Sequence, residues 1–213
     1  FHEFKTRTFT SEDELRAAFA EQSRFGEGLL FQSYHRGQGV GIELLMAGGE
    51  AVAAFQHRRL SENPPSGGVA VVAEAEVIDP VLLDHSVRLL RALEWDGVAM
   101  VEYRHDRATG ETALMEVNGR FWGSLPLAVA AGMDFPLHAW QLSQGITPAV
   151  PASYHYGLRV RWTAGSLKRF AYAFAGEGER IPLSSATRQL FTDFRIGTRS
   201  AMWSWDDPAP AIQ

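Results

Sequence analysis

The pattern of hydrophobic and polar positions along the chain predicts helices and strands in an order that favours an α+β protein. Ser11 and Glu14 form a capping box ahead of a helix expected over 12–22. Asp79 and Pro80 are typical of the cap and first turn of a second helix. Further helices are expected over 124–132, 135–144, 165–175 and 184–192.

Short apolar or alternating runs between these helices predict strands. The run over 29–34 is expected to form a buried strand. Strands over 39–46 and 51–58 enclose a glycine pair, which favours a hairpin turn because glycine adopts positive φ readily. A second hairpin is expected from strands over 97–104 and 111–118. Further strands are expected over 69–77 and 155–163, and a loop over 61–68.

Composition narrows the class of protein without naming it. A chain of 213 residues with 46% hydrophobic and 21% charged residues suits one large domain, or a domain and a half. The net charge of −5 gives no electrostatic case for nucleic acid or an anionic membrane as the main partner. The absence of cysteine excludes disulfides and a cysteine nucleophile, and it fits a cytoplasmic location. The chain starts without Met or a signal peptide, so we expect an upstream N-terminal domain.

The second hairpin carries the strongest chemical signal. Glu102 lies in an otherwise apolar strand, and Glu116 and Asn118 lie on its partner. Since side chains alternate along a strand, Glu116 and Asn118 face the same way, and the turn at 106–110 can bring Glu102 to that face. Two carboxylates and an amide oxygen suit Mg²⁺ or Mn²⁺. The alternative is an exposed pair of acids and an ordinary turn asparagine.

At these residues the chain resembles the ATP-grasp superfamily. The runs Val101–Tyr103 and Met115–Ser124 are similar to the signature of carbamoyl-phosphate-synthase-like ligases, which have a Glu-x-Asn-x-Arg element. The resemblance covers about 10–145. It implies the C-terminal subdomain of an ATP-grasp fold, with an antiparallel sheet flanked by helices. Residues 1–148 would form an N-terminally incomplete nucleotide and magnesium region, and 149–213 a helical and strand extension.

The resemblance also implies a role for each residue of the second hairpin. Glu102 and Glu116 would hold Mg²⁺ against the phosphates of ATP, and Asn118 would complete the metal shell. Arg120 would meet the γ-phosphate or an acyl phosphate, because a forked guanidinium suits that charge. The alternative for Arg120 is an ion pair with Glu102 or Glu116.

Nucleotide contacts are expected from an earlier part of the chain. In the resemblance, 30–34 is the segment that contacts adenine: Gln32 would accept from the adenine amino group, and Ser33 and the backbone near Tyr34 would read its other edge. Gln38 is a candidate ribose contact.

A basic cluster follows the first hairpin. The resemblance places His57, Arg58 and Arg59 near the phosphates and the substrate carboxylate, where arginines would neutralise an acyl phosphate. The alternative is a solvated arginine pair.

These roles predict an ATP-dependent ligase that joins a small-molecule carboxylate to an amine, a thiol or another nucleophile through an acyl phosphate. The two lysines that the family uses are expected upstream, and a homodimer is a further expectation. One alternative is a non-catalytic nucleotide-binding or scaffolding remnant. Another is a divalent-metal hydrolase built on the same carboxylates.

Overall fold

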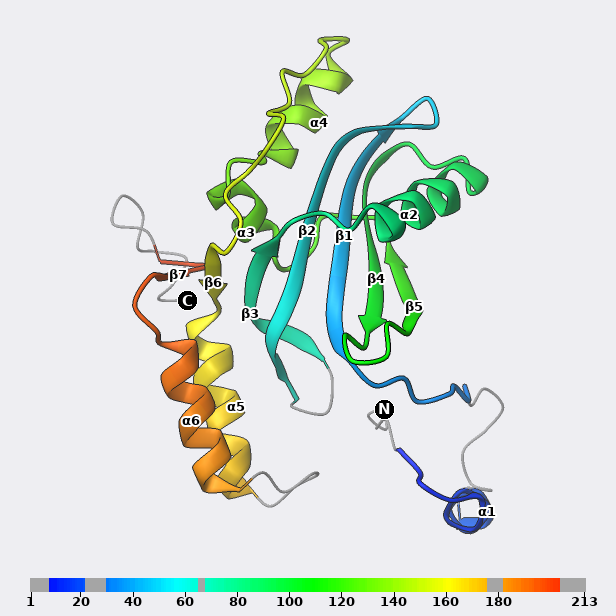
Figure 1. The fold of residues 1–213 in the computed structure, drawn as a ribbon, viewed down its shortest axis with the longest axis vertical. Coiled ribbons are helices and arrows are strands. Elements are labelled where there is room, and N and C mark those ends of the chain that lie inside the picture. The colour runs from blue at the N-terminus through cyan, green and yellow to red at the C-terminus, as the bar shows by residue number, and fades with distance from the viewer. Residues whose placement is uncertain (1–7, 22–29, 65–67, 176–181, 204–213) are drawn as a thin grey trace. The chain divides into compact units, whose positions relative to one another are not determined.

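A computed structural model describes residues 8–21, 30–64, 68–175 and 182–203, and it divides the chain into two compact units, 1–36 and 37–213. The second unit is built on a seven-stranded sheet of order β5-β4-β1-β2-β3-β6-β7 (Figure 1). Neighbouring strands pair antiparallel except β6 and β7, which are parallel. The α+β prediction is therefore confirmed.

The strands and helices of the described residues have the following bounds. The strands are β1 Gln38–Ala47, β2 Glu50–Asn63, β3 Val69–Glu76, β4 Gly97–His105, β5 Thr112–Asn118, β6 Arg159–Arg161 and β7 Thr198–Ser200. The helices are α1 Glu12–Glu21, α2 Pro80–Ala92, α3 Leu125–Ala130, α4 Phe135–Ser143, α5 Thr163–Ala175 and α6 Leu183–Asp193.

The first unit contains α1, which begins where the capping box predicts. The Ser11 hydroxyl accepts a hydrogen bond from the Glu14 amide at 3.2 Å. The buried strand expected over 29–34 is wrong for its described part, because residues 30–34 are irregular and exposed. Leu30, for example, is 81% exposed. An apolar run alone does not establish burial, since an exposed segment can carry the same residues. Residues 22 and 29 lie outside the described part.

The first hairpin extends further than the sequence pattern predicts. Gly48 and Gly49 form its turn with positive φ, as expected. Strand β2 then continues to Asn63 and takes in residues that were expected to form a loop. Only the start of that loop is corrected in this way, because residues 65–67 lie outside the described part. Strand β6 is shorter than its predicted range, and the sequence pattern did not indicate β7.

Two hydrophobic cores lie on the two faces of the sheet. Helix α2 covers one face (Figure 1), where its Leu82 and Leu90 pack with Ile42, Leu44 and Val101. Helices α3 and α4 contribute to the other core, which holds Phe55, Met100, Leu127, Ala128 and Phe135. No helix in the described part of the chain is long and apolar enough to cross a membrane.

Strand β1 changes character along the face that carries the second core. The residues of β1 that face this side are, in chain order, Gly39, Gly41, Glu43 and Leu45. A Cβ on Gly41 would lie 2.4 Å from Cε1 of His57, and one on Gly39 would lie 2.8 Å from Cδ of Arg59. The two glycines therefore leave room for side chains of β2 to lie over β1. We call this polar half of the sheet surface the site face.

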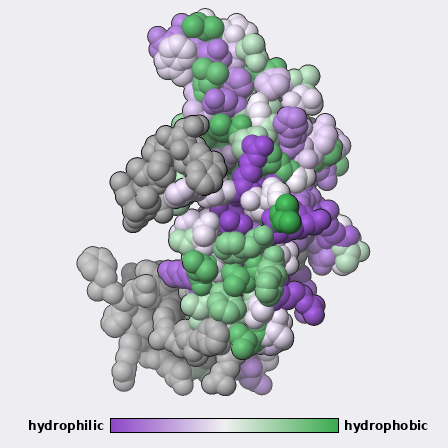
Figure 2. Space-filling model, turned by 90° about the vertical axis from the view of Figure 1, so that its left-hand side faces the viewer, coloured by the Kyte–Doolittle hydropathy of each residue, from purple (hydrophilic) through white to green (hydrophobic). Residues whose placement is uncertain are grey.

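The C-terminal helices α5 and α6 pack against each other, and α5 contacts β2 and β3 (Figure 1). Figure 2 shows a hydrophobic area on the surface that this part of the molecule presents. Exposed apolar side chains in α5, α6 and the segment that follows are Leu167, Leu183, Phe191, Phe194 and Ile196.

The close approach at Gly41 makes a stability prediction. Gly41→Ala is expected to lower the free energy of unfolding by about 1–3 kcal/mol, because the added methyl group overlaps His57. Urea denaturation measures this change. Gly123→Ala is the matched control, since its Cβ would meet nothing within 4 Å and its φ is not in the positive region. Equal stability of the two variants would contradict the prediction.

Candidate functional site

The β4–β5 hairpin places two carboxylates directly opposite each other. Near the turn, Arg104 pairs with Ala113 and Tyr103 with Leu114. The register then shifts by one residue, so that Glu102 pairs with Glu116. Without this bulge at Met115, Glu102 would face Met115, and Glu116 would point to the other face. The bulge therefore brings the two acids to one face of the sheet.

Asn118 joins this pair, as the alternation along β5 predicts. Its side-chain amide donates to Oε1 of Glu116 at 2.7 Å. Glu102 is only 8% exposed, Glu116 is exposed, and Asn118 is partly exposed. The structure thus brings together the three predicted metal ligands, with one carboxylate buried and the other open to solvent.

Arg59 reaches Glu102 from two strands away. Glu102 lies on β4 and Arg59 on β2, and the Arg59 side chain passes over Gly39 of β1 to bond the Glu102 carboxylate. Burial raises the pKa of Glu102, the Arg59 charge opposes this shift, and the neighbouring Glu116 charge adds to it. Arg59 is therefore the cation that offsets a buried carboxylate next to a second acid.

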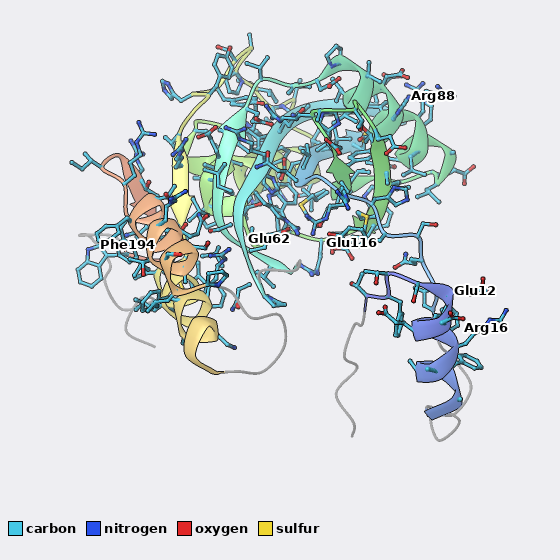
Figure 3. All side chains as sticks on the ribbon, turned by 60° about the horizontal axis from the view of Figure 1, so that its bottom comes forward. Glu12, Arg16, Glu62, Arg88, Glu116 and Phe194 are labelled. Atoms are coloured by element: carbon cyan, nitrogen blue, oxygen red, sulfur yellow. The ribbon has the colours of Figure 1, made fainter. Side chains whose placement is uncertain are left out.

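Glu62 extends this ion pair into a short chain of charges. Its Oε1 lies 3.2 Å from Nη1 of Arg59, and its Oε2 lies 3.2 Å from Nη2 of Arg104. Nη1 of Arg59 also donates to the carbonyl of Gly68 at 2.9 Å. Figure 3 labels Glu62 at the end of β2 and Glu116 on β5. Arg59 is thus held from both sides, by Glu62 and by Glu102.

A buried acid–imidazole pair lies in the same part of the site face. The Glu43 carboxylate bonds Nδ1 of His57, and both side chains are almost fully buried. Burial raises the pKa of Glu43, and His57 opposes the shift. His57 lies opposite Gly41, which in turn lies opposite Glu102, so the pair adjoins the row of carboxylates.

Two of the predicted arginines are not brought to the carboxylates. Arg58 alternates onto the opposite face of β2, where it forms ion pairs with Glu74 at 2.6 Å and Glu76 at 3.2 Å. Arg120 is exposed and donates to the carbonyl of Phe121 at 2.9 Å. Within the described residues Arg120 forms no ion pair with Glu102 or Glu116. The basic cluster at 57–59 is therefore split, with His57 and Arg59 on the site face.

The predicted nucleotide contacts lie apart from the hairpin in the chain. Gln32, Ser33 and Tyr34 belong to the first unit and are exposed. Gln38 begins β1 opposite His105, and alternation places it on the α2 face with Val40. The adenine and ribose contacts stay predictions.

Sequence reasoning missed five residues of the site face: Gly39, Gly41, Glu43, Glu62 and Arg104. A Gly-x-Gly step inside a strand is unusual, because glycine weakens a strand unless another group approaches closely. An acid inside the apolar run Ile42–Leu45 is a second signal of the same kind. Glu62 gave no such signal, since it lay in a segment expected to be a loop.

The donor set fits a divalent cation. Glu102, Glu116 and Asn118 offer hard oxygen ligands, and two adjacent carboxylates favour a cation between them. No cluster of three His, Asp or Glu side chains suited to a metal occurs in the described residues. Protein ligands here would thus be two acids and an amide, with the remaining positions left to phosphate and water.

An ATP-grasp domain is the class of protein that this fold and hairpin define. The chain belongs to the family described as "ATP-grasp in the biosynthetic pathway with Ter operon", which matches residues 26–166. Members of the ATP-grasp superfamily are generally ATP-dependent ligases that use ATP and Mg²⁺. No curated protein matches the chain.

Several solved structures resemble the chain at low identity. Biotin carboxylase from Campylobacter jejuni is 11% identical, with a TM-score of 0.46 over 60% of this chain and 30% of that one. Pyruvate carboxylase from Rhizobium etli is 17% identical, with a TM-score of 0.45 over 70% of this chain and 15% of that one. Urea amidolyase from K. lactis is 17% identical, with a TM-score of 0.43 over 57% and 8%. The chain thus spans less than a third of each of these proteins.

The Arg59–Glu102 contact predicts competition with a metal ion. Arg59→Gln is expected to tighten Mg²⁺ binding in the absence of nucleotide by roughly tenfold, equivalent to about 1.4 kcal/mol, because the ion no longer displaces a guanidinium. Titration calorimetry measures the affinity. Arg58→Gln is the matched control, since it removes the same charge one residue away on the opposite face. Similar affinities in the two variants would refute the competition.

The buried Glu43 makes a pH prediction. Because burial raises the pKa of Glu43 above its ordinary 4.5, the stability that the Glu43 carboxyl contributes falls as the pH rises from this ordinary value toward the raised pKa. Glu43→Gln lacks this loss, so its free energy of unfolding relative to the native chain should increase from about pH 4 to about pH 7. Urea denaturation at both pH values measures the difference. A difference in the free energy of unfolding that stays constant between the two pH values would contradict the raised pKa of Glu43.

Proposed function

We propose that the chain forms part of an ATP-dependent ligase that joins a small-molecule carboxylate to an amine or another nucleophile, with an acyl phosphate as intermediate. The observation that carries this proposal is the pairing of Glu102 with Glu116, with Asn118 on the same face, inside the part of the chain that matches the ATP-grasp family. Membership of the ATP-grasp family supports the use of ATP, and the hairpin supplies the residues that would hold a magnesium ion.

Each residue of the hairpin has a separate role in the proposal. Glu102 would hold the ion from the buried side, and Glu116 would hold it from the solvent side. Asn118 would orient Glu116 through its amide and offer its own oxygen. When bound, Mg²⁺ or Mn²⁺ would neutralise charge on the phosphates of ATP and align them for transfer.

The reaction needs no protein nucleophile. A carboxylate oxygen of the substrate attacks the γ-phosphorus, the bond between that phosphorus and the bridging oxygen breaks, and ADP leaves with the electron pair. The amine then attacks the acyl carbon, phosphate leaves, and the amine loses a proton. The protein contributes positioning and positive charge.

Arg59 and Arg120 are the arginines that the proposal assigns to transfer. Arg59 lies on the site face next to Glu102 and would turn to the transferred phosphate when a metal ion takes over Glu102. Arg120 is two residues beyond Asn118, and its guanidinium has only a carbonyl partner among the described residues. Arg58 is left out of this step, since it is paired with Glu74 and Glu76 on the other face.

Contacts to adenine and ribose complete the proposal. Gln32, Ser33 and Tyr34 would bind adenine and Gln38 the ribose, as the family resemblance implies. Their exposed side chains are available to a ligand.

Replacement of Glu116 tests the proposal. In the full-length protein, Glu116→Gln should lower Mg²⁺-dependent formation of ADP, measured with a panel of carboxylates and amines, by at least about a hundredfold. The Glu111→Gln variant, which changes an exposed acid just before β5, should keep the activity of the wild type. Calorimetric titration of ATP with Mg²⁺ should show weaker binding only for Glu116→Gln.

Other outcomes separate the alternatives. Tight binding of ATP and Mg²⁺ without turnover on any carboxylate would favour a nucleotide-binding or scaffolding protein. Turnover that survives in Glu116→Gln would refute the assignment of the metal site.

A further inference from the structure

The C-terminal helices touch the strand that carries Arg59. Helices α5 and α6 lie beside the end of β2 (Figure 1), and hydrogen bonds join them to Ser61 and Glu62 of that strand. The family match ends at residue 166, so most of α5 and all of α6 lie beyond it. The family match therefore does not explain these helices, and their contacts with β2 suggest a role for them.

Asp193 is the centre of the first contact. Its side chain is 2% exposed and forms no ion pair within the described residues. Its carboxylate accepts instead from the hydroxyls of Ser61 at 3.1 Å and Ser166 at 2.9 Å, and from the amide of Gln189 at 2.9 Å. One buried carboxylate thus ties β2 to α5 and α6, and the hydrogen bonds to it come from neutral groups.

Arg169 makes the second contact. Its Nε donates a hydrogen bond to the backbone carbonyl of Glu62 in β2 at 3.0 Å. Partial burial lowers the pKa of Arg169, while the charges of Asp193 and Glu62 oppose the shift. The Arg169 guanidinium is therefore stabilised by the charges of Asp193 on α6 and Glu62 on β2. We call the contact of Arg169 and Asp193 with Ser61 and Glu62 the junction.

Irregular pairing lets neighbouring residues of β2 serve two sets of partners. The register with β3 shifts between Arg59 and Ser61 and again between Ser61 and Glu62. Ser61 consequently bonds Asp193, while the next side chain, Glu62, pairs with Arg59 and Arg104 on the site face. A single step of the backbone joins the C-terminal helices to the arginine that contacts Glu102.

We propose that Arg169 and Asp193 are positioning residues: they hold Ser61 and Glu62 at the end of β2, so that Glu62 keeps Arg59 aimed at Glu102. This inference rests on the proposed function, because it gives the C-terminal helices a role in the same site. Neither residue needs to touch substrate or ATP. Their effect passes through the backbone of Glu62 and then through its carboxylate.

Two simpler roles make different predictions. If Arg169 acted only as a positive charge near the metal ligands, its removal would tighten Mg²⁺ binding and leave the Arg59 contact in the metal-free chain unchanged. If it only stabilised the helices, its removal would lower the unfolding temperature and leave the Arg59 contact unchanged. A positioning role loosens Arg59 even in a folded chain without metal.

Hydrogen exchange of the Arg59 side-chain N–H groups, followed by NMR in the metal-free chain, tests the proposal. Ion pairs with Glu62 and Glu102 slow this exchange, so Arg169→Ala and Asp193→Asn should each accelerate it by about threefold or more. Arg169→Lys keeps the charge and a donor, and it should restore most of the slow exchange. Lys168→Ala removes an exposed charge on the same helix and is the matched control.

A double-mutant cycle locates the route. Glu62→Gln should accelerate the Arg59 exchange by itself, and adding Arg169→Ala should then have little further effect. Additive effects would overturn the proposed route, as would unchanged Arg59 exchange in a folded Arg169→Ala variant. If that variant does not fold, the outcome is decided by Asp193→Asn with the same readout.

Mg²⁺ titrations of the same variants separate this inference from the proposed function. Wild-type chain that binds no Mg²⁺ would contradict the proposed function and leave the exchange result standing as the test of positioning. Wild-type chain that binds Mg²⁺, with Arg59 exchange unaffected in every variant of the junction, would refute the positioning role alone.

Discussion

The contact between Arg59 and Glu102 is the interaction on which the rest of the site depends. It crosses a whole strand, because the two residues lie on β2 and β4 with β1 between them. Such a reach requires that β1 present no side chain at the crossing, which explains Gly39, and Gly41 leaves the same room for His57. A buried carboxylate without a cation would be costly, so the guanidinium stabilises the fold before any ligand arrives.

The same sheet surface serves two purposes. Under α3 and α4 it is packed with apolar side chains such as Phe55 and Met100, which give the strands a rigid frame. Glu43 lies in the same row as Phe55 and Met100, and the next row on this surface carries His57 and Glu102. The apolar half holds the strands in register, and the polar half uses that register to bring charges together. A rigid frame is what a site for phosphate transfer requires, because its chemistry depends on positioning.

Much of this arrangement could be predicted from the sequence, and the failures have physical causes. Alternation along β5 correctly placed Glu116 and Asn118 on one face. The prediction that Arg58 and Arg59 act in one site was wrong, because adjacent residues in a strand point to opposite faces. The apolar run at 30–34 suggested burial that the structure does not show. Contacts such as Ser61 with Asp193 join residues far apart in the chain, and no local pattern reveals them.

The bulge in β5 gives the spacing of the two acids a meaning of its own. In a regular hairpin, opposed residues are separated by numbers of one parity, and the pair Arg104–Ala113 sets that parity as odd (113 − 104 = 9). Glu102 and Glu116 are separated by an even number (116 − 102 = 14), so the irregularity at Met115 is required for them to meet. In related sequences, a turn lengthened or shortened by one residue would dispense with the bulge, and the arithmetic of the spacing alone would indicate which of the two solutions a relative has adopted.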